Sequence, residues 1–175
     1  YLGRTSADVR KKCCIEGTKI LPDDVYCKLQ CAEKSETDPL AKDFLNQCIL
    51  NADIAKNEDM PICQDTGFAV FFVEIGQEIE IDGGTLTDAI NEGTRQGYQE
   101  GYLRKSIVTD PLFERKNTRD NTPAVIHYGL VAGDKFKITF APKGGGSENM
   151  SGVKMLKPSD GKAGVVDFVV NTVVN

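Results

Sequence analysis

The sequence lacks the features of a membrane-spanning or nucleic-acid-binding protein. It contains no apolar run close to the ~20 residues that a bilayer-spanning helix needs. Its 21 Lys and Arg residues are outnumbered by 26 Asp and Glu residues, which gives a formal net charge of −5. Because no strong basic field exists to attract phosphates, we expect binding neither to nucleic acid nor to a membrane surface. No signal peptide is visible, although the chain begins at Tyr1 rather than at methionine.

The cysteines lack the paired CxxC spacing of a zinc site. All of them lie in the first 63 of 175 residues, whereas a secreted disulfide framework usually spreads them through a short, loop-rich chain. They are Cys13, Cys14, Cys27, Cys31, Cys48 and Cys63. We therefore expect reduced thiols in a cytoplasmic protein. A zinc- or disulfide-stabilised binding domain built on the N-terminal cysteines is the alternative, and metal analysis with thiol titration distinguishes the two.

The apolar pattern predicts an α+β, or mixed α/β, fold in which an N-terminal helical segment precedes a small sheet packed with helices. Three helices are expected in the first third, and the last of them has the clearest apolar stripe. They run from Ser6 or Asp8 to about Gly17, from Pro22 to about Lys34, and from Thr37 to about Asn57.

The pattern changes at residue 69, where a buried strand begins. Strands are predicted at 69–75, 78–81, 125–130 and 135–141. Further helices are predicted from Thr85 or Thr87 to about Leu103, and from Ser159 or Asp160 onward. Within the first of these, Gly93, Gly97 and Gly101 recur every four residues. This face without side chains predicts close packing against another backbone.

The segment Pro61–Gly67 places a thiol, a carboxamide, a carboxylate and a hydroxyl on four consecutive residues. Pro61 fixes φ at its start, and Gly67 permits a tight backbone at its end. Such a turn can aim several polar side chains at one point. A metal-dependent enzyme can use that arrangement, because a thiolate binds the metal while its neighbours orient a substrate and move a proton.

Three other polar clusters lie at 102–106, 110–123 and 143–151. Each cluster alone has a structural explanation: a buried thiol at Cys63, an arginine at a helix C-terminus, a solvated loop or a glycine hinge. Together they supply a thiolate, an acid/base carboxylate, an arginine fork and a glycine-rich anion nest. That combination suits a small dianionic acid held against a metal centre. The single histidine, His127, is interpreted as structural.

Several long motifs occur in a fixed order, and with them the chain resembles the alpha subunit of the class I iron–sulfur fumarate hydratases over about Val9–Asn175. The related L-tartrate dehydratase alpha subunit shares this architecture. The motifs are Pro61–Gly67, Gly101–Ser106, Asp110–Pro111, Arg115–Thr118, Asp120–Ala124 and Gly146–Asn149.

The resemblance implies a hydro-lyase with a [4Fe–4S] cluster, in which one iron without a protein ligand acts as a Lewis acid on the substrate. It implies that Cys63 is a cluster ligand and that Gln64 and Asp65 contact the substrate. Asp65 would also transfer a proton at carbon or orient the group that does so. Arg104 would clamp one carboxylate, and the loop at 110–123 would brace the site. The other end of the dianion would meet the backbone of one of Gly144, Gly145 and Gly146.

The resemblance also implies a partner and a larger catalytic domain. It places two further cluster cysteines after the final helix, and other catalytic groups on a beta subunit or C-terminal domain. We therefore expect residues 1–175 to be a single domain, the N-terminal part of the catalytic domain, with no cluster and no hydratase activity alone. The expected reaction is reversible dehydration of (S)-malate to fumarate. The alternatives are dehydration of L-tartrate and, for this stretch alone, a noncatalytic assembly or dicarboxylate-binding module.

Overall fold

The computed structural model describes the backbone of residues 3–174 and the side chains of residues 11–146 and 149–174. The chain consists of two compact units, Tyr1–Lys143 and Gly144–Asn175. The first unit contains the sheet and four helices, which confirms the predicted α+β fold. No helix within residues 3–174 combines the length and the apolar character needed to cross a bilayer.

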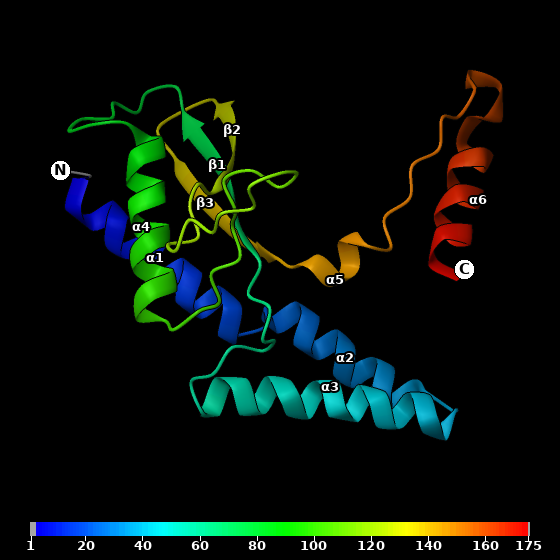
Figure 1. Ribbon diagram of the computed structural model, residues 1–175. Coiled ribbons are helices and arrows are strands. Elements are labelled where there is room, and N and C mark those ends of the chain that lie inside the picture. Colours follow the sequence, from blue (N-terminus) through cyan, green and yellow to red (C-terminus); the bar gives the residue numbers. More distant parts are fainter. Residues whose placement is uncertain (1–2, 175) are drawn as a thin grey trace. The chain divides into compact units, whose positions relative to one another are not determined.

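The three predicted N-terminal helices are present as α1 (Gly3–Lys19), α2 (Asp23–Ser35) and α3 (Pro39–Asn57) (Figure 1). Asp38 caps α3, because its carboxylate accepts hydrogen bonds from the backbone N–H groups of Leu40 and Ala41, both at 2.9 Å. The prediction that α1 begins at Ser6 or Asp8 was wrong. Both residues lie inside this helix, since no proline or glycine interrupts residues 4–16.

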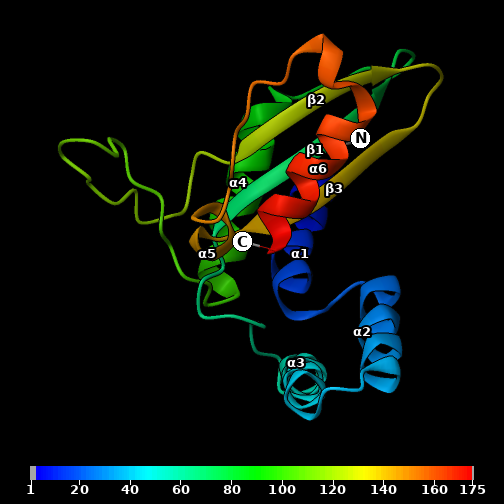
Figure 2. The same cartoon turned by 90° about the vertical axis from the view of Figure 1, so that its right-hand side faces the viewer.

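The sheet has the strand order β2-β1-β3, with β1 (Phe68–Gly76) in the centre (Figure 2). It pairs in parallel with β2 (Val125–Val131) and antiparallel with β3 (Phe136–Lys143). The predicted strand at 78–81 was wrong. After β1 the chain turns, because the N–H of Glu78 donates to the Gly133 carbonyl at 3.1 Å and the N–H of Ile79 donates back to Gly76 at 3.0 Å.

Helices α1 and α4 (Leu86–Glu100) cover one face of the sheet (Figure 1). The core lies between these two helices and the sheet. Alternate residues of β1 point into this core, as the pleat of a strand requires. The buried core residues are Cys14, Ala69, Phe71, Val73, Ile90, Tyr98 and Leu103. On the other face, the exposed ring of His127 stacks on Phe72 with centroids 5.0 Å apart.

Helix α4 carries the predicted glycine face, and α1 packs closely against it. A Cβ atom at Gly97 would lie 2.8 Å from the Cys14 Cβ and 3.2 Å from the Lys11 carbonyl oxygen. One at Gly101 would lie 3.0 Å from a side-chain carbon of Ile15. This confirms the predicted close approach. Helix α4 begins after its Thr85 cap but ends at Glu100, short of the expected Leu103.

The second unit contains the short helix α5 (Gly145–Glu148), a 3-10 turn at Pro158–Asp160 and the predicted final helix, α6 (Gly161–Val174). The carboxylate of Asp160 accepts a hydrogen bond from the backbone N–H of Lys157 at 2.8 Å, which closes the turn before α6. Because α5 begins at Gly145, the glycines at 144–146 lead into a helical turn rather than an unstructured hinge.

The α1–α4 contact makes Gly97 sensitive to the smallest side chain. We expect Gly97→Ala to destabilise the protein by about 1–3 kcal/mol through overpacking, despite the better helix propensity of alanine. Chemical denaturation measures the change. Gln99→Ala, an exposed substitution on the same helix, should alter stability by no more than about 0.5 kcal/mol. A Gly97→Ala protein as stable as the wild type would contradict the packing argument.

Candidate functional site

The polar segment predicted as a functional turn lies between α3 and β1, and its first half is fixed to the helices. The N–H of Ile62 donates to the Thr18 carbonyl of α1 at 2.9 Å. The side-chain amide of Asn51 on α3 donates to the Ile62 carbonyl, also at 2.9 Å. Since both backbone groups of Ile62 are bonded, the residue that precedes Cys63 has a defined position.

The second half of the turn is closed by Asp65 and Gly67. Gly67 has a φ of +62°, which confirms the tight left-handed backbone expected there. Its N–H donates to the Asp65 carboxylate at 3.0 Å, so that side chain is held over its own turn. The hydroxyl of Tyr98 on α4 donates to the Thr66 carbonyl at 3.0 Å, with the Gly67 carbonyl at 3.3 Å.

The segment after α4 joins the turn through a side chain and a carbonyl. The hydroxyl of Thr66 donates to the Arg104 carbonyl at 3.1 Å. Thr66 is buried, whereas Arg104 is exposed. This bond therefore brings the backbone that carries the predicted arginine fork next to the turn that carries the predicted thiolate and carboxylate.

Asn121 makes a second connection between the same two segments. Its side-chain carbonyl accepts hydrogen bonds from the N–H groups of Ser106 at 2.8 Å and Ile107 at 3.3 Å. Its side-chain amide donates to the Gly67 carbonyl at 3.0 Å. In the same loop, the side-chain amide of Asn117 donates to the Lys105 carbonyl at 2.9 Å. The loop at 110–123 thus contacts both segments.

The predicted site side chains remain accessible while their backbone is fixed. Cys63, Gln64 and Arg104 are exposed, and Asp65 is half-buried. The Cys63 thiol lies 3.4 Å from the side-chain carbonyl oxygen of Gln64 and donates to it. Beside the turn lies a cavity of about 210 Å³, lined by Gly17, Thr18, Leu21, Ile62, Cys63, Asp65, Thr66 and Pro142. Cys63 and Asp65 line this cavity, whereas Gln64 and Arg104 do not.

The predicted site residues fall into two groups. The first unit contains Cys63, Gln64, Asp65 and Arg104, and the Thr66–Arg104 bond brings the backbones of their two segments together. The predicted glycines Gly144, Gly145 and Gly146 belong to the second unit, at the start of α5. The sequence interpretation did not single out Tyr98, and it included Asn121 only as a member of the motif Asp120–Ala124 and of the loop expected to brace the site.

An iron–sulfur cluster held by the described residues alone would require several cysteine ligands close together. A [4Fe–4S] cluster is held by several cysteine thiolates, and Cys63 supplies one exposed thiol. Among the described residues, no group of three or more His, Cys, Asp and Glu side chains could hold a metal ion. The other cysteines lie on α1, α2 and α3, and all six are free thiols. The described residues therefore fit one ligand position rather than a complete set.

Burial raises the pKa of two core residues, Cys14 and Tyr98. Burial raises the pKa of the Cys14 thiol from its ordinary value of 9.0 to about 12. Burial also raises the pKa of Tyr98, so its hydroxyl keeps the proton that it donates to the turn. Burial opposes ionisation of Asp120 as well, but hydrogen bonds from Thr122 and Arg95 lower the pKa of this carboxyl.

The comparisons with known proteins agree on one family. The family model described as fumarate hydratase (Fumerase) matches residues 7–175. A protein of Methanocaldococcus jannaschii, provisionally named L(+)-tartrate dehydratase subunit alpha, is 37% identical over 164 residues, or 91% of this chain and 58% of its own length. The L(+)-tartrate dehydratase subunit alpha of Escherichia coli UTI89 is 31% identical over 155 residues, which are 87% of this chain and 51% of its own length. The chain thus spans little more than half of these relatives.

The raised thiol pKa predicts how stability depends on pH. Between pH 9.0 and about 12 the folded state holds the Cys14 proton and the unfolded state releases it, so stability falls as pH rises through this range. Below pH 9.0 this group contributes no such dependence. The fall is at most about 1.4 kcal/mol per pH unit for one group. Chemical denaturation at about pH 8 and about pH 10 measures it.

Cys14→Ser is the matched control for this pH dependence, because a serine hydroxyl does not titrate in the same range. Its free energy of unfolding should fall less steeply between the two pH values than that of the wild type. Equal slopes in the two proteins would show that the Cys14 thiol is not the group responsible.

Proposed function

Because the chain belongs to the fumarate hydratase (Fumerase) family, we propose that it is part of a hydro-lyase that reversibly dehydrates (S)-malate to fumarate and water. The observation that carries the proposal is the hydrogen bond between Thr66 and Arg104. It joins the segment with a thiol and a carboxylate to the segment with a guanidinium group. These are the groups that a reaction on a small dicarboxylate needs within reach of one another.

Each exposed side chain has a role in this reaction. The guanidinium of Arg104 offers two parallel N–H donors to one substrate carboxylate, which fixes its orientation. The carboxamide of Gln64 lies beside the thiol and donates to the substrate. Dehydration removes a proton from one carbon and hydroxide from the next. Asp65 transfers that proton or orients the group that does so, from a position set by its bond to Gly67.

The whole enzyme would add groups beyond those of the first unit. Cys63 would be one thiolate ligand of a [4Fe–4S] cluster, which supplies Lewis-acid chemistry at the substrate hydroxyl. Its exposure favours a ligand role over that of a core thiol. The backbone of one of Gly144, Gly145 and Gly146 would meet the second carboxylate. A metal centre open to substrate is oxygen-sensitive, so a reducing cytoplasm is the proposed location.

The names of the relatives support a partner and a second candidate substrate. Both are named as alpha subunits, so we propose a beta subunit as the partner of this chain. Both are also named for L(+)-tartrate, which makes dehydration of tartrate the second candidate function. The two substrates differ by one hydroxyl group. For residues 1–175 without partner or cluster, the third candidate function is that of a noncatalytic dicarboxylate-binding or assembly module.

Anaerobic turnover by the complete alpha subunit tests the proposal, with its partner present and its cluster reconstituted. Malate, fumarate and L-tartrate are assayed side by side. Rapid interconversion of malate and fumarate is expected. Preference for tartrate would keep the hydro-lyase chemistry and select the second candidate. No turnover of any of the three, with iron and sulfide shown to be bound, would overturn the proposed function.

The proposed carboxylate clamp predicts a specific loss on substitution of Arg104. Arg104→Lys keeps the charge but removes the bidentate fork, and hydrogen bonds to charged groups contribute about 1.5–3 kcal/mol. We therefore expect kcat/KM for the preferred substrate to fall by about 10–100-fold. Steady-state kinetics of the assembled enzyme measures the change.

Arg119→Lys is the matched control for the clamp, because Arg119 is an exposed arginine of the loop that lies outside the recognised motifs. It should keep kcat/KM within about twofold of the wild type, as surface substitutions usually do. Equal losses in both variants would contradict a clamp at Arg104.

A further inference from the structure

We infer that Asn121 is a positioning residue, which fixes the Cys63–Gly67 turn relative to the segment that carries Arg104. The inference rests on the proposed function for its catalytic meaning, but its structural content is independent of the substrate. It assigns a role to a side chain that would touch neither substrate nor cluster.

Both the oxygen and the nitrogen of the Asn121 carboxamide make hydrogen bonds. Its oxygen accepts from the backbone of Ser106 and Ile107, two and three residues after Arg104, and its nitrogen donates to the Gly67 carbonyl. The residue is 0% exposed. Because a buried amide that loses a partner leaves an unsatisfied polar group, these three bonds resist any relative displacement of the two segments.

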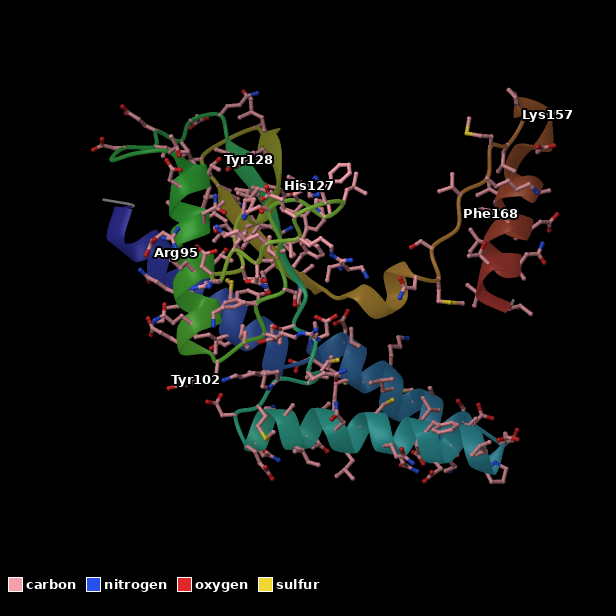
Figure 3. All side chains as sticks on the ribbon, viewed as in Figure 1. Arg95, Tyr102, His127, Tyr128, Lys157 and Phe168 are labelled. Carbon is pink, nitrogen blue, oxygen red and sulfur yellow. The ribbon has the colours of Figure 1, made fainter. Side chains whose placement is uncertain are left out.

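The backbone of Asn121 is held in place by its neighbour Asp120. One carboxylate oxygen of Asp120 accepts from the Thr122 N–H at 3.0 Å and from its hydroxyl at 2.8 Å. The other accepts from the side chain of Arg95 at 3.1 Å. Figure 3 labels Arg95 on α4. The φ of Asn121 is +60°, a left-handed conformation that asparagine tolerates better than most residues. The Arg95–Asp120 bond therefore ties the backbone that carries the Asn121 carboxamide to α4.

A carboxamide supplies both the acceptor and the donor that this position needs. The Gly67 carbonyl needs a donor, and the N–H groups of Ser106 and Ile107 need an acceptor. Asn121→Asp keeps the shape and the acceptor but presents a second oxygen to the Gly67 carbonyl. This change should release the turn while it keeps the contact on the Arg104 side. A displacement of about 1 Å in a catalytic constellation can cost 10²-fold in rate.

Thiol alkylation of the complete alpha subunit, prepared without its cluster, tests the structural part, with peptide mass spectrometry to follow each cysteine. We expect Asn121→Asp to change the alkylation rate of Cys63 about threefold or more, because a displaced turn alters the contact that this exposed thiol makes with Gln64. Cys27, Cys31 and Cys48 are exposed elsewhere and serve as internal references. Buried Cys14 reports global unfolding.

The matched control is Asn117→Asp, the same change in the same loop. Asn117 donates to the Lys105 carbonyl and accepts from the Arg119 N–H, and among the described residues its side chain makes no hydrogen bond to the turn. The Cys63 rate should therefore stay within about 1.5-fold of the wild type. The inference is overturned if Asn121→Asp leaves the Cys63 rate unchanged. It is also overturned if Cys14 and Cys63 accelerate together, because Asn121 would then support only global stability.

Kinetics of the assembled enzyme test the catalytic part. Asn121→Asp should lower kcat by about 10–100-fold while the bound iron and the thermal midpoint stay near those of Asn117→Asp. An unchanged kcat in Asn121→Asp would overturn the positioning role. Absence of turnover in the wild type would instead refute the proposed function, and the alkylation result would still decide the structural role of Asn121.

Discussion

The constraint on which the rest of the first unit depends is the need to satisfy two backbone carbonyls at the entry to the central strand. The carbonyls of Thr66 and Gly67 lie where the chain enters the sheet, and both residues are buried. A buried carbonyl without a donor costs free energy comparable to a lost hydrogen bond. The donors come from two distant side chains, Tyr98 and Asn121. By bonding these carbonyls, the protein also fixes the turn that carries its candidate chemistry.

Helix α4 acts as the frame for this network because α1 can approach it closely. Because Gly97 has no side chain, Cys14 of α1 can approach α4 closely. Side chains of both helices pack against β1 in the core. On the same helix, Tyr98 reaches the turn and Arg95 reaches Asp120. The packing of two helices and the position of the candidate site therefore share one physical cause. A change in the helix crossing would displace the donors together with the core.

The sequence predicts the elements of this fold better than it predicts the contacts between them. The capped start of α3 at Asp38 and the glycine face of α4 follow from local rules, and both are present. The stretch at 78–81 alternates like a strand but forms none, because the pattern does not show whether a partner strand is available. The exposed residues of the turn are apparent in the sequence as a cluster. The bonds that Tyr98 and Asn121 make to the turn are not, because they join residues 31 and 54 positions apart.

This division between exposed chemistry and buried support has a consequence for specificity. Cys63, Gln64 and Arg104 are exposed, so replacing one of them leaves no cavity in the core. The carbonyls beneath them are bonded to side chains that no substrate need touch. The backbone of the turn can therefore stay the same while the exposed groups and the partner change. Within the proposed function, this explains how one family can hold substrates that differ by a single hydroxyl group. The buried side chains hold the two segments together, and within the proposed function the choice of substrate would belong to the groups that these segments display.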